Sequence, residues 1–106
     1  MANVTERIQS EINADKIVLF IKGTPEEPQC GFSARTVEIF KGLGKPFHTV
    51  NVIANPEIRA MLPQISNWPT FPQIFIQGKL VGGCDIVSEM LERGELQKMV
   101  EEAFQG

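Results

Sequence analysis

The hydrophobic residues of this chain form short dense runs that alternate with stretches in which apolar positions recur every three or four residues. The densest run, Ile17–Ile21, predicts a strand over residues 16–22 that is buried on both faces. Before this run, helical spacing predicts a helix that Asn3 caps, with Glu6 as its capping-box partner, and that extends to about residue 13. The apolar positions of this first helix are Val4, Ile8 and Ile12.

Helical spacing returns after a loop with two prolines, and Gly42 and Gly44 are expected to end this second helix. A second strand is predicted over residues 46–52, where apolar residues become dense again. Asn55 and Pro56 then supply the N-cap and the first helical position of a third helix. The apolar positions of these two helices are Ala34, Val37, Phe40 and Leu43, followed by Ile58, Met61, Leu62 and Ile65.

The last third of the chain predicts a β-hairpin followed by two helices. Strands over residues 73–76 and 79–81 flank a two-residue turn, in which Gly78 supplies a positive φ angle. Asp85 is expected to cap the next helix and Gly94 to end it. The inward positions of that helix are Ile86, Val87, Met90 and Leu91. The spacing of four apolar residues marks the last helix: Leu96, Met99, Val100 and Ala103.

This order of elements predicts one α/β domain over residues 1–106, in which a helix joins two parallel strands and another helix crosses to a hairpin. The expected architecture is thioredoxin-like, with a central four-stranded mixed sheet and helices on both of its faces. Pro72 lies directly before a predicted strand and is therefore a candidate for a cis peptide bond. The alternative is an ordinary trans proline at the edge of the sheet.

Composition and charge narrow the classes of function. Apolar residues make up 42% of the chain, enough for one core that needs no disulfides. The formal net charge is −3 and like charges form no block, which argues against nucleic-acid binding. No apolar run approaches the roughly 20 residues that cross a bilayer, and residues 1–7 lack a signal or transit pattern. These features predict a cytoplasmic or already processed protein without a membrane partner.

The chain has two cysteines, Cys30 and Cys84, and no secretory signal, so free or ligating thiols are expected instead of a disulfide framework. Cys30 stands where a loop meets a helix, and both the unpaired N–H groups there and a nearby Lys22 favour its thiolate. The alternative is a small buried residue without reactivity. Ser33 occupies the place of the second cysteine in a redox Cys-x-x-Cys motif, so no local disulfide can form. His48, the only histidine, is interpreted as structural.

Four short motifs follow one another at the predicted ends of strands and helices, and together they make the chain resemble a monothiol glutaredoxin of the Cys-Gly-Phe-Ser type. The resemblance spans nearly the whole chain. It implies a thioredoxin-like fold, glutathione binding, and a 2Fe-2S cluster that bridges a homodimer with glutathione as co-ligand. It also implies iron-sulfur client proteins or BolA-like proteins as partners. The motifs are Lys22-Gly23-Thr24, Cys30-Gly31-Phe32-Ser33, Trp68-Pro69-Thr70-Phe71-Pro72-Gln73 and Gly82-Gly83-Cys84-Asp85.

Glutathione carries two carboxylates and one ammonium, and the sequence offers a partner for each. The resemblance assigns Lys22 and Arg59 to the glycyl carboxylate, and it assigns the backbone of Phe71 to the cysteinyl residue if the next peptide bond is cis. The N–H groups of Cys84 and Asp85, at a helix start, suit the γ-glutamyl carboxylate, while the Asp85 side chain suits the ammonium. Without the resemblance, Lys22 and Arg59 are more often solvated surface charges, and Asp85 is only an N-cap.

A 2Fe-2S cluster normally takes four thiolates, and one chain offers only Cys30 and Cys84. A dimer can complete the set with Cys30 of each subunit and two glutathione thiols, or with both cysteines of each subunit. The family favours the first arrangement, which makes Cys30 the predicted metal ligand and Cys84 a structural residue or a source of backbone contacts. A disulfide between Cys30 and Cys84 stays open. Trp68 is assigned to packing.

Three functions therefore compete. The leading one is a glutathione-dependent homodimer that carries a labile 2Fe-2S cluster in iron-sulfur delivery or sensing. The alternative is a thiol-disulfide oxidoreductase, in which the Cys30 thiolate attacks mixed disulfides with glutathione; its classical activity is expected to be weak. The third is an interaction module with an inert thiol.

Overall fold

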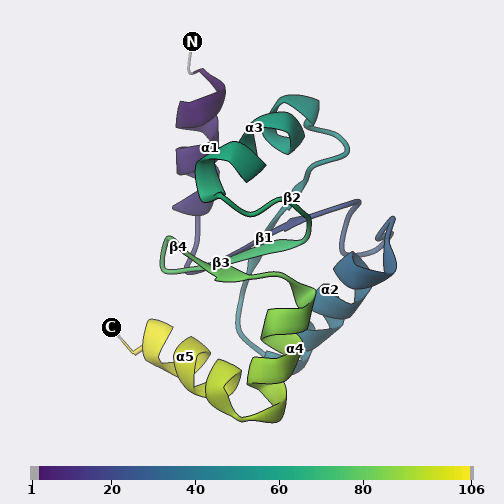
Figure 1. The fold of residues 1–106 in the computed structure, drawn as a ribbon. Coiled ribbons are helices and arrows are strands. Elements are labelled where there is room, and N and C mark those ends of the chain that lie inside the picture. Colours follow the sequence, from purple (N-terminus) through teal and green to yellow (C-terminus); the bar gives the residue numbers. More distant parts are fainter. Residues whose placement is uncertain (1–2, 106) are drawn as a thin grey trace.

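Four strands form a mixed sheet at the centre of the molecule (Figure 1). The computed structural model describes residues 3–105, so residues 1, 2 and 106, which the single-domain prediction includes, lie outside the described part. Strand β2 runs parallel to β1, whereas β3 is antiparallel to both β1 and β4. This arrangement confirms the predicted four-stranded mixed sheet. In the order β2-β1-β3-β4, the strands are His48–Asn51, Ile17–Ile21, Gln73–Ile76 and Lys79–Gly82.

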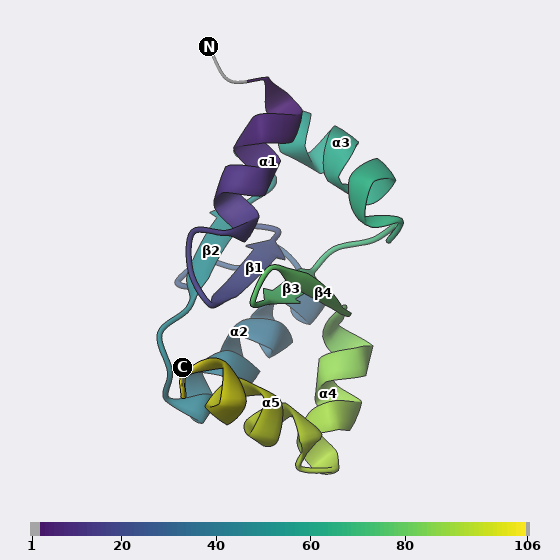
Figure 2. The same ribbon diagram turned by 90° about the vertical axis from the view of Figure 1, so that its left-hand side faces the viewer.

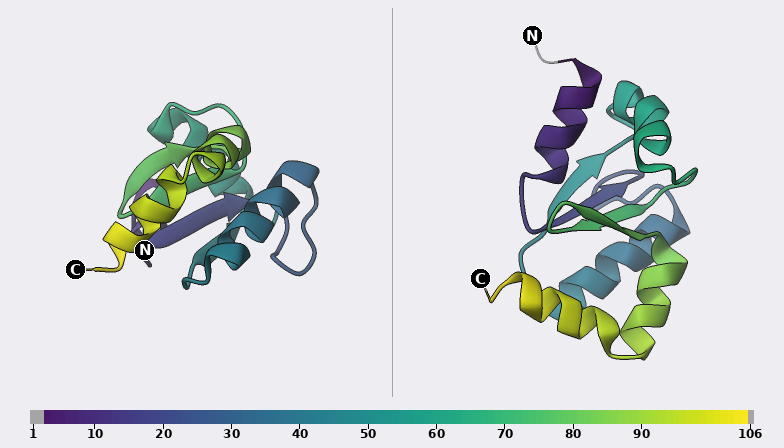
Figure 3. Two further views of the ribbon diagram at one scale, coloured as in Figure 1. Left: turned by 90° about the horizontal axis from the view of Figure 1, so that it is seen from below. Right: turned by 60° about the vertical axis from the view of Figure 1, so that its left-hand side comes forward.

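Helices cover both faces of the sheet, as the order of the elements predicted (Figures 2 and 3). Helices α1 and α3 lie on one face, and α2, α4 and α5 lie on the other. Each helix turns an apolar stripe toward the sheet and a polar side to solvent, which is the arrangement that helical spacing of apolar residues produces. The helices are α1 (Val4–Ile12), α2 (Gly31–Leu43), α3 (Pro56–Ser66), α4 (Cys84–Glu92) and α5 (Glu95–Ala103).

The sheet has a hydrophobic core on each of its faces, and the strand β1 contributes side chains to both. All five residues of β1 are buried. Ile17, Leu19 and Ile21 pack in the cluster with residues of α2, α4 and α5, while Val18 and Phe20 pack in the cluster with residues of α1 and α3. Successive side chains point to opposite faces of a strand, so a strand covered on both sides needs apolar residues throughout. Burying each of these side chains contributes roughly 1.5–3 kcal/mol.

Gly42 does not end α2, contrary to the prediction. The helix continues through it to Leu43, and Gly44 alone forms the C-cap, with a left-handed φ of 75°. An interior helical glycine costs about 1 kcal/mol relative to alanine. The buried side of the helix, which includes Val37 and Phe40, outweighs this cost.

The start of α4 also differs from the prediction. Asp85 is not the N-cap, because the helix begins at Cys84 and Gly83 occupies the cap position without a side-chain hydrogen bond. Ile86 is 38% exposed instead of facing the core. The Ile86 side chain lies over Gly82, where a Cβ atom would come within 2.9 Å of it. This segment therefore bends tightly at the end of β4.

The hairpin turn is confirmed, and both of its central residues have positive φ angles, 52° at Gln77 and 78° at Gly78. Strand β2 is shorter than predicted and begins at His48. Pro46 has no N–H to donate to a ladder, which is consistent with the later start. At the other end, the N–H of Val52 still donates to Ile21 at 2.9 Å.

The sheet topology brings four chain segments to one edge of the sheet. Because β2 is parallel to β1, both strands end at this edge; because β3 is antiparallel to β1, β3 begins there and β4 ends there. The peptide bond between Phe71 and Pro72, just before β3, is cis, as predicted for Pro72. Within residues 3–105, no helix combines the length and apolar character needed to cross a membrane.

Candidate functional site

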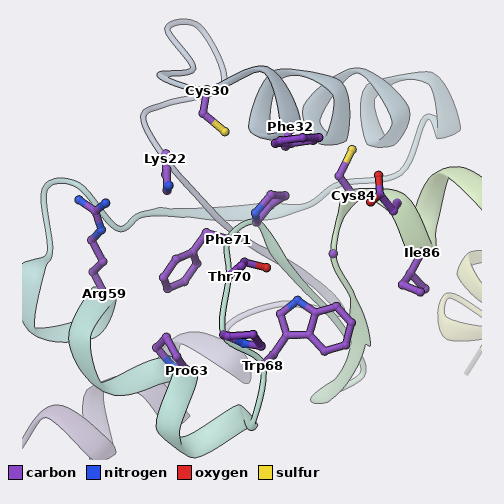
Figure 4. A pocket seen from close by; sticks show the side chains of 14 residues that line it. Lys22, Cys30, Phe32, Arg59, Pro63, Trp68, Thr70, Phe71, Cys84 and Ile86 are labelled. Carbon is purple, nitrogen blue, oxygen red and sulfur yellow. The ribbon is translucent and has the colours of Figure 1, made fainter.

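A pocket of about 590 Å³ opens at this edge of the sheet (Figure 4). It is lined by the end of β1, the start of α2, the first turns of α3, the loop before β3, and the start of α4. The structure brings all six predicted site residues together in this lining, although they are spread over more than half of the sequence. They are Lys22, Cys30, Arg59, Phe71, Cys84 and Asp85.

Cys30 is the N-cap residue of α2, with extended backbone, as its position in the sequence predicted. Its Sγ accepts a hydrogen bond from the backbone N–H of Ser33 at 3.4 Å. The hydroxyl of Ser33 lies 3.6 Å from the same sulfur and accepts the backbone N–H of Lys22 at 3.0 Å. Ser33 is fully buried, whereas Cys30 is half-buried and borders the pocket.

The pKa of Cys30 lies below its ordinary value. Burial raises this pKa, but the hydrogen bonds from the backbone and hydroxyl of Ser33 and from the backbone of Phe32, together with the Lys22 ammonium, lower it by more. All of these groups stabilise the anionic sulfur more than the neutral thiol. The site therefore favours a thiolate, as the helix N-terminus and the nearby cation predicted.

Lys22 and Arg59 lie on the same side of the pocket (Figure 4). Neither forms an ion pair with a side chain in the part of the chain that the structure describes. Two cations without internal partners at the mouth of one pocket are suited to a ligand carboxylate. Both residues line the pocket, and their role toward the glycyl carboxylate of glutathione stays a prediction.

The opposite side of the pocket is formed by the start of α4, where Cys84 and Ile86 appear in Figure 4. The first N–H groups of this helix have no intrahelical partner, and the cap residue Gly83 offers no side chain to them. Such a helix start is suited to a second anion. Asp85 is exposed beside it, in the first turn. Cys84 is buried, at 7% exposure, and its Sγ lies 3.9 Å from Ser88 Oγ.

The loop before β3 forms the floor between these two sides. Buried Gln73 fixes this loop, because its amide donates to the carbonyls of Trp68 at 2.9 Å and Thr70 at 3.3 Å. Phe71 follows Thr70 in this loop. No backbone hydrogen bond within residues 3–105 uses the N–H or the carbonyl of Phe71. Its backbone is therefore free to pair with an extended peptide. Phe71 and Pro72 both line the pocket.

Sequence reasoning missed part of this lining. Trp68, assigned to packing, borders the pocket, and its Nε1 atom is buried without a hydrogen-bond partner among the described residues. Phe32, which is 61% exposed, and Ile86 also line it. A large aromatic residue that lies off the apolar stripe of α2, two residues after Cys30, is the signal that could have revealed Phe32. The rest of the lining that was not predicted as site residues is Pro63, Pro69, Thr70, Pro72 and Gly83.

Comparison with known proteins decides the family. Residues 17–81, which run from β1 to β4, match the family model described as glutaredoxin. The chain belongs to the glutaredoxin family. This glutaredoxin is 50% identical over 102 residues to glutaredoxin 4 of Escherichia coli K12, covering 96% of this chain and 89% of that one. It is 54% identical over 95 residues to the probable monothiol glutaredoxin 2 of Rickettsia felis, covering 90% and 91%.

Solved structures agree with the thioredoxin-like glutaredoxin fold. The solution structure of reduced poplar apo GrxS14 is similar to this glutaredoxin with a TM-score of 0.84 and 45% sequence identity. The match covers 97% of this chain and 94% of the poplar chain. The fold and the family that the four sequence motifs implied are both confirmed.

Proposed function

We propose that this glutaredoxin binds glutathione in the pocket, with the glutathione sulfur beside Cys30. The observation that carries the proposal is the distribution of charge. Lys22 and Arg59, which form no ion pair among residues 3–105, border one side, and the open start of α4 borders the other. A tripeptide with a carboxylate at each end would span them. The free backbone of Phe71 would pair with its middle residue, and the Asp85 carboxylate would accept the ammonium.

We further propose that the glutathione-loaded protein holds a 2Fe-2S cluster, with Cys30 as its only protein ligand from each chain. The donor set fits, because Cys30 borders the pocket and favours a thiolate. Cys84 fits less well, since its thiol is buried against Ser88. Four thiolates then require two chains and two glutathione molecules. A cluster held in this way would be labile and therefore transferable to another protein.

The proposal includes a homodimer bridged by the cluster, a cytoplasmic location, and partners that are iron-sulfur clients or BolA-like proteins. Support for the dimer is the thiol count, because one chain offers only Cys30 and Cys84. Sedimentation of the protein with and without cluster would test the dimer, and localisation of a tagged protein in its own cells would test the compartment.

Anaerobic reconstitution with iron, sulfide and glutathione tests the cluster. The expected product is a coloured dimer with one 2Fe-2S cluster for two chains, as measured by visible absorbance, iron content and size. Cys30→Ser should abolish the colour, and Cys84→Ser should retain it. A colourless, iron-free monomer from the unaltered protein would refute cluster binding. Colour that requires Cys84 would instead support the arrangement with both cysteines of each subunit.

The lowered pKa of Cys30 beside the same pocket also favours a second function, thiol-disulfide exchange. The Cys30 thiolate would attack the glutathione sulfur of a mixed disulfide, forming a Cys30–glutathione disulfide and releasing the substrate as a thiolate. A second glutathione thiolate would then attack this disulfide and leave as glutathione disulfide, which restores the Cys30 thiolate. Rapid turnover of a glutathionylated peptide by the cluster-free protein would favour this enzyme; negligible turnover would favour the cluster carrier.

A further inference from the structure

Asn51, the last residue of β2, receives three backbone hydrogen bonds on a single side-chain oxygen. Its Oδ1 accepts the N–H of Gly23 at 3.0 Å, of Ile53 at 3.0 Å and of Ala54 at 3.4 Å. The first donor follows β1, and the other two belong to the loop that leads to α3. One side chain therefore joins the residue that follows Lys22 to the loop that precedes Arg59.

The bond to Gly23 contributes to fixing Lys22. The N–H of Lys22 donates to Ser33 at 3.0 Å, and its carbonyl accepts the N–H of Gln29 at 2.8 Å. Asn51 holds the next N–H along the chain. The backbone of Lys22 is thus held at its N–H, at its carbonyl and at the N–H of the next residue. The Lys22 ammonium, in contrast, has no ion-pair partner within residues 3–105.

A second set of bonds leads from Asn51 to Arg59. The side-chain amide of Asn55 donates to the backbone carbonyl of Asn51 at 2.9 Å. The carbonyl of Asn55 accepts the N–H of Arg59 at 3.0 Å, in the first turn of α3. From α1, the Arg7 guanidinium donates to the Asn55 side-chain oxygen at 3.2 Å. These hydrogen bonds therefore fix the position of the start of α3 relative to Asn51.

We infer that Asn51 is a positioning residue that sets the spacing of Lys22 and Arg59, and that this spacing makes the pocket selective for a ligand with a terminal carboxylate. The inference rests on the proposed binding of glutathione. Two cations share one carboxylate only if both come within hydrogen-bond distance of it. Since neither side chain forms an ion pair with any other described residue, the backbone anchors decide where the two charges can reach.

The test compares binding of glutathione with binding of its glycyl monoethyl ester, which lacks only the terminal carboxylate. Calorimetric titration of the unaltered protein should show that the ester binds about tenfold more weakly, the effect of charge-assisted hydrogen bonds. The side chain of serine is too short for its hydroxyl to accept all three N–H groups. In Asn51→Ser, the ratio of glutathione to ester affinity should therefore fall to about threefold or less. Asn51→Asp keeps the accepting oxygen and should keep the ratio. Asn13→Ala, which removes a side-chain bond to Gln9 outside the pocket, is the matched control.

A ratio, unlike an affinity, is not changed by a general loss of stability. If Asn51→Ser retains the full ratio, the positioning role is wrong while glutathione binding stands. Equal binding of glutathione and ester by the unaltered protein also overturns the inference. If the unaltered protein does not bind glutathione, both the proposed function and the inference fail. Should Asn51→Ser not fold, Asn55→Ala provides a second test. It removes the side-chain bond from Asn55 to the Asn51 carbonyl, on which the position of Arg59 depends, and must also lower the ratio of glutathione to ester affinity.

Discussion

The hydroxyl of Ser33 lies 3.6 Å from the sulfur of Cys30 and accepts the backbone N–H of Lys22 at 3.0 Å. When the thiol ionises, it no longer has a proton to donate, and the Ser33 O–H can donate to the thiolate while its oxygen keeps the Lys22 N–H. A serine in the place of a second motif cysteine therefore does more than prevent a disulfide. It supplies a buried donor that stabilises the reactive form of Cys30.

Replacement of this donor is the first prediction. Ser33→Ala should raise the pKa of Cys30, because a hydrogen bond to the thiolate is lost while the backbone donors remain. Titration of thiolate absorbance should show the midpoint moving to higher pH, and alkylation at a fixed pH below the midpoint should slow. Ser88→Ala, which removes a hydroxyl 3.9 Å from Cys84, is the control and should leave the Cys30 midpoint in place. An unchanged midpoint in Ser33→Ala would contradict the role of the hydroxyl.

The lowered pKa of Cys30 also predicts a pH dependence of stability. Since the pKa is lower in the folded than in the unfolded protein, ionisation stabilises the fold. This contribution is complete above the unfolded pKa, about 8.5 for a free cysteine, and is lost as the pH falls through the folded pKa. Urea unfolding of the unaltered protein and of Cys30→Ser, in which serine can still cap the helix, should give a difference in free energy that shrinks as the pH is lowered. A difference that does not vary with pH would count against the linkage.

Ser33→Cys should convert the site into a dithiol. The Ser33 hydroxyl is already near the Cys30 sulfur, so a thiol at the same position would be within reach of it. Mild oxidation should then form a disulfide between the two positions, detected by mass spectrometry as a loss of two hydrogens and by blocked alkylation of Cys30. Cluster retention after reconstitution should fall, because the disulfide consumes the ligand. If Cys30 pairs with Cys84 instead, the local geometry does not control the choice of partner.

The fold was largely predictable because its elements follow simple patterns. The run Ile17–Ile21 is apolar throughout and became a strand buried on both faces. Gly44 and Gly78 marked a helix end and a hairpin turn, where left-handed backbone is required. The prediction that Gly42 ends a helix was wrong, because a packed helix tolerates an interior glycine that costs about 1 kcal/mol. Patterns of this kind predict where elements exist better than where they end.

The candidate site was predictable only where a motif carried its chemistry. Cys30 could be placed at a helix start from the sequence, and the resemblance supplied Lys22 and Arg59. The hydrogen bond from Gly23 to Asn51 could not be foreseen, since these two residues become neighbours only through the parallel pairing of β1 and β2. The buried Nε1 of Trp68 likewise depends on how the loop before β3 lies against Gly83.

Lys22→Gln should weaken glutathione binding by about tenfold, because it removes one charge-assisted bond to a carboxylate. The loss should shrink as salt is raised, since exposed charges are screened. Trp68 is the only tryptophan, and the chain has no tyrosine, so its fluorescence reports on the pocket during the titration. Lys98→Gln, on α5 and outside the pocket lining, is the control and should bind as the unaltered protein does. Equal affinity of Lys22→Gln at low salt would remove this residue from the site.

A pair of glycines gives the last prediction. Gly23 has a φ of 98°, and a Cβ atom there would lie 2.5 Å from the carbonyl oxygen of Glu27 and 2.8 Å from the nitrogen of Gln29. Both contacts are to backbone, which cannot move aside as a flexible side chain can.

Gly23→Ala should therefore destabilise the fold by at least about 1–3 kcal/mol, the cost of a strained backbone conformation. It should also weaken glutathione binding, because the displaced residues 27–29 carry the bond to the Lys22 carbonyl. Gly42→Ala is the matched substitution: its helical position has no atom within 4 Å of a new Cβ, so it should stabilise the protein by about 0.5–1 kcal/mol and leave binding unchanged. Urea unfolding and calorimetric titration of the two variants give the comparison. Equal stability of the two variants would mean that the turn after β1 can relax, and then the close fit of Gly23 would not be what holds Lys22 at the pocket.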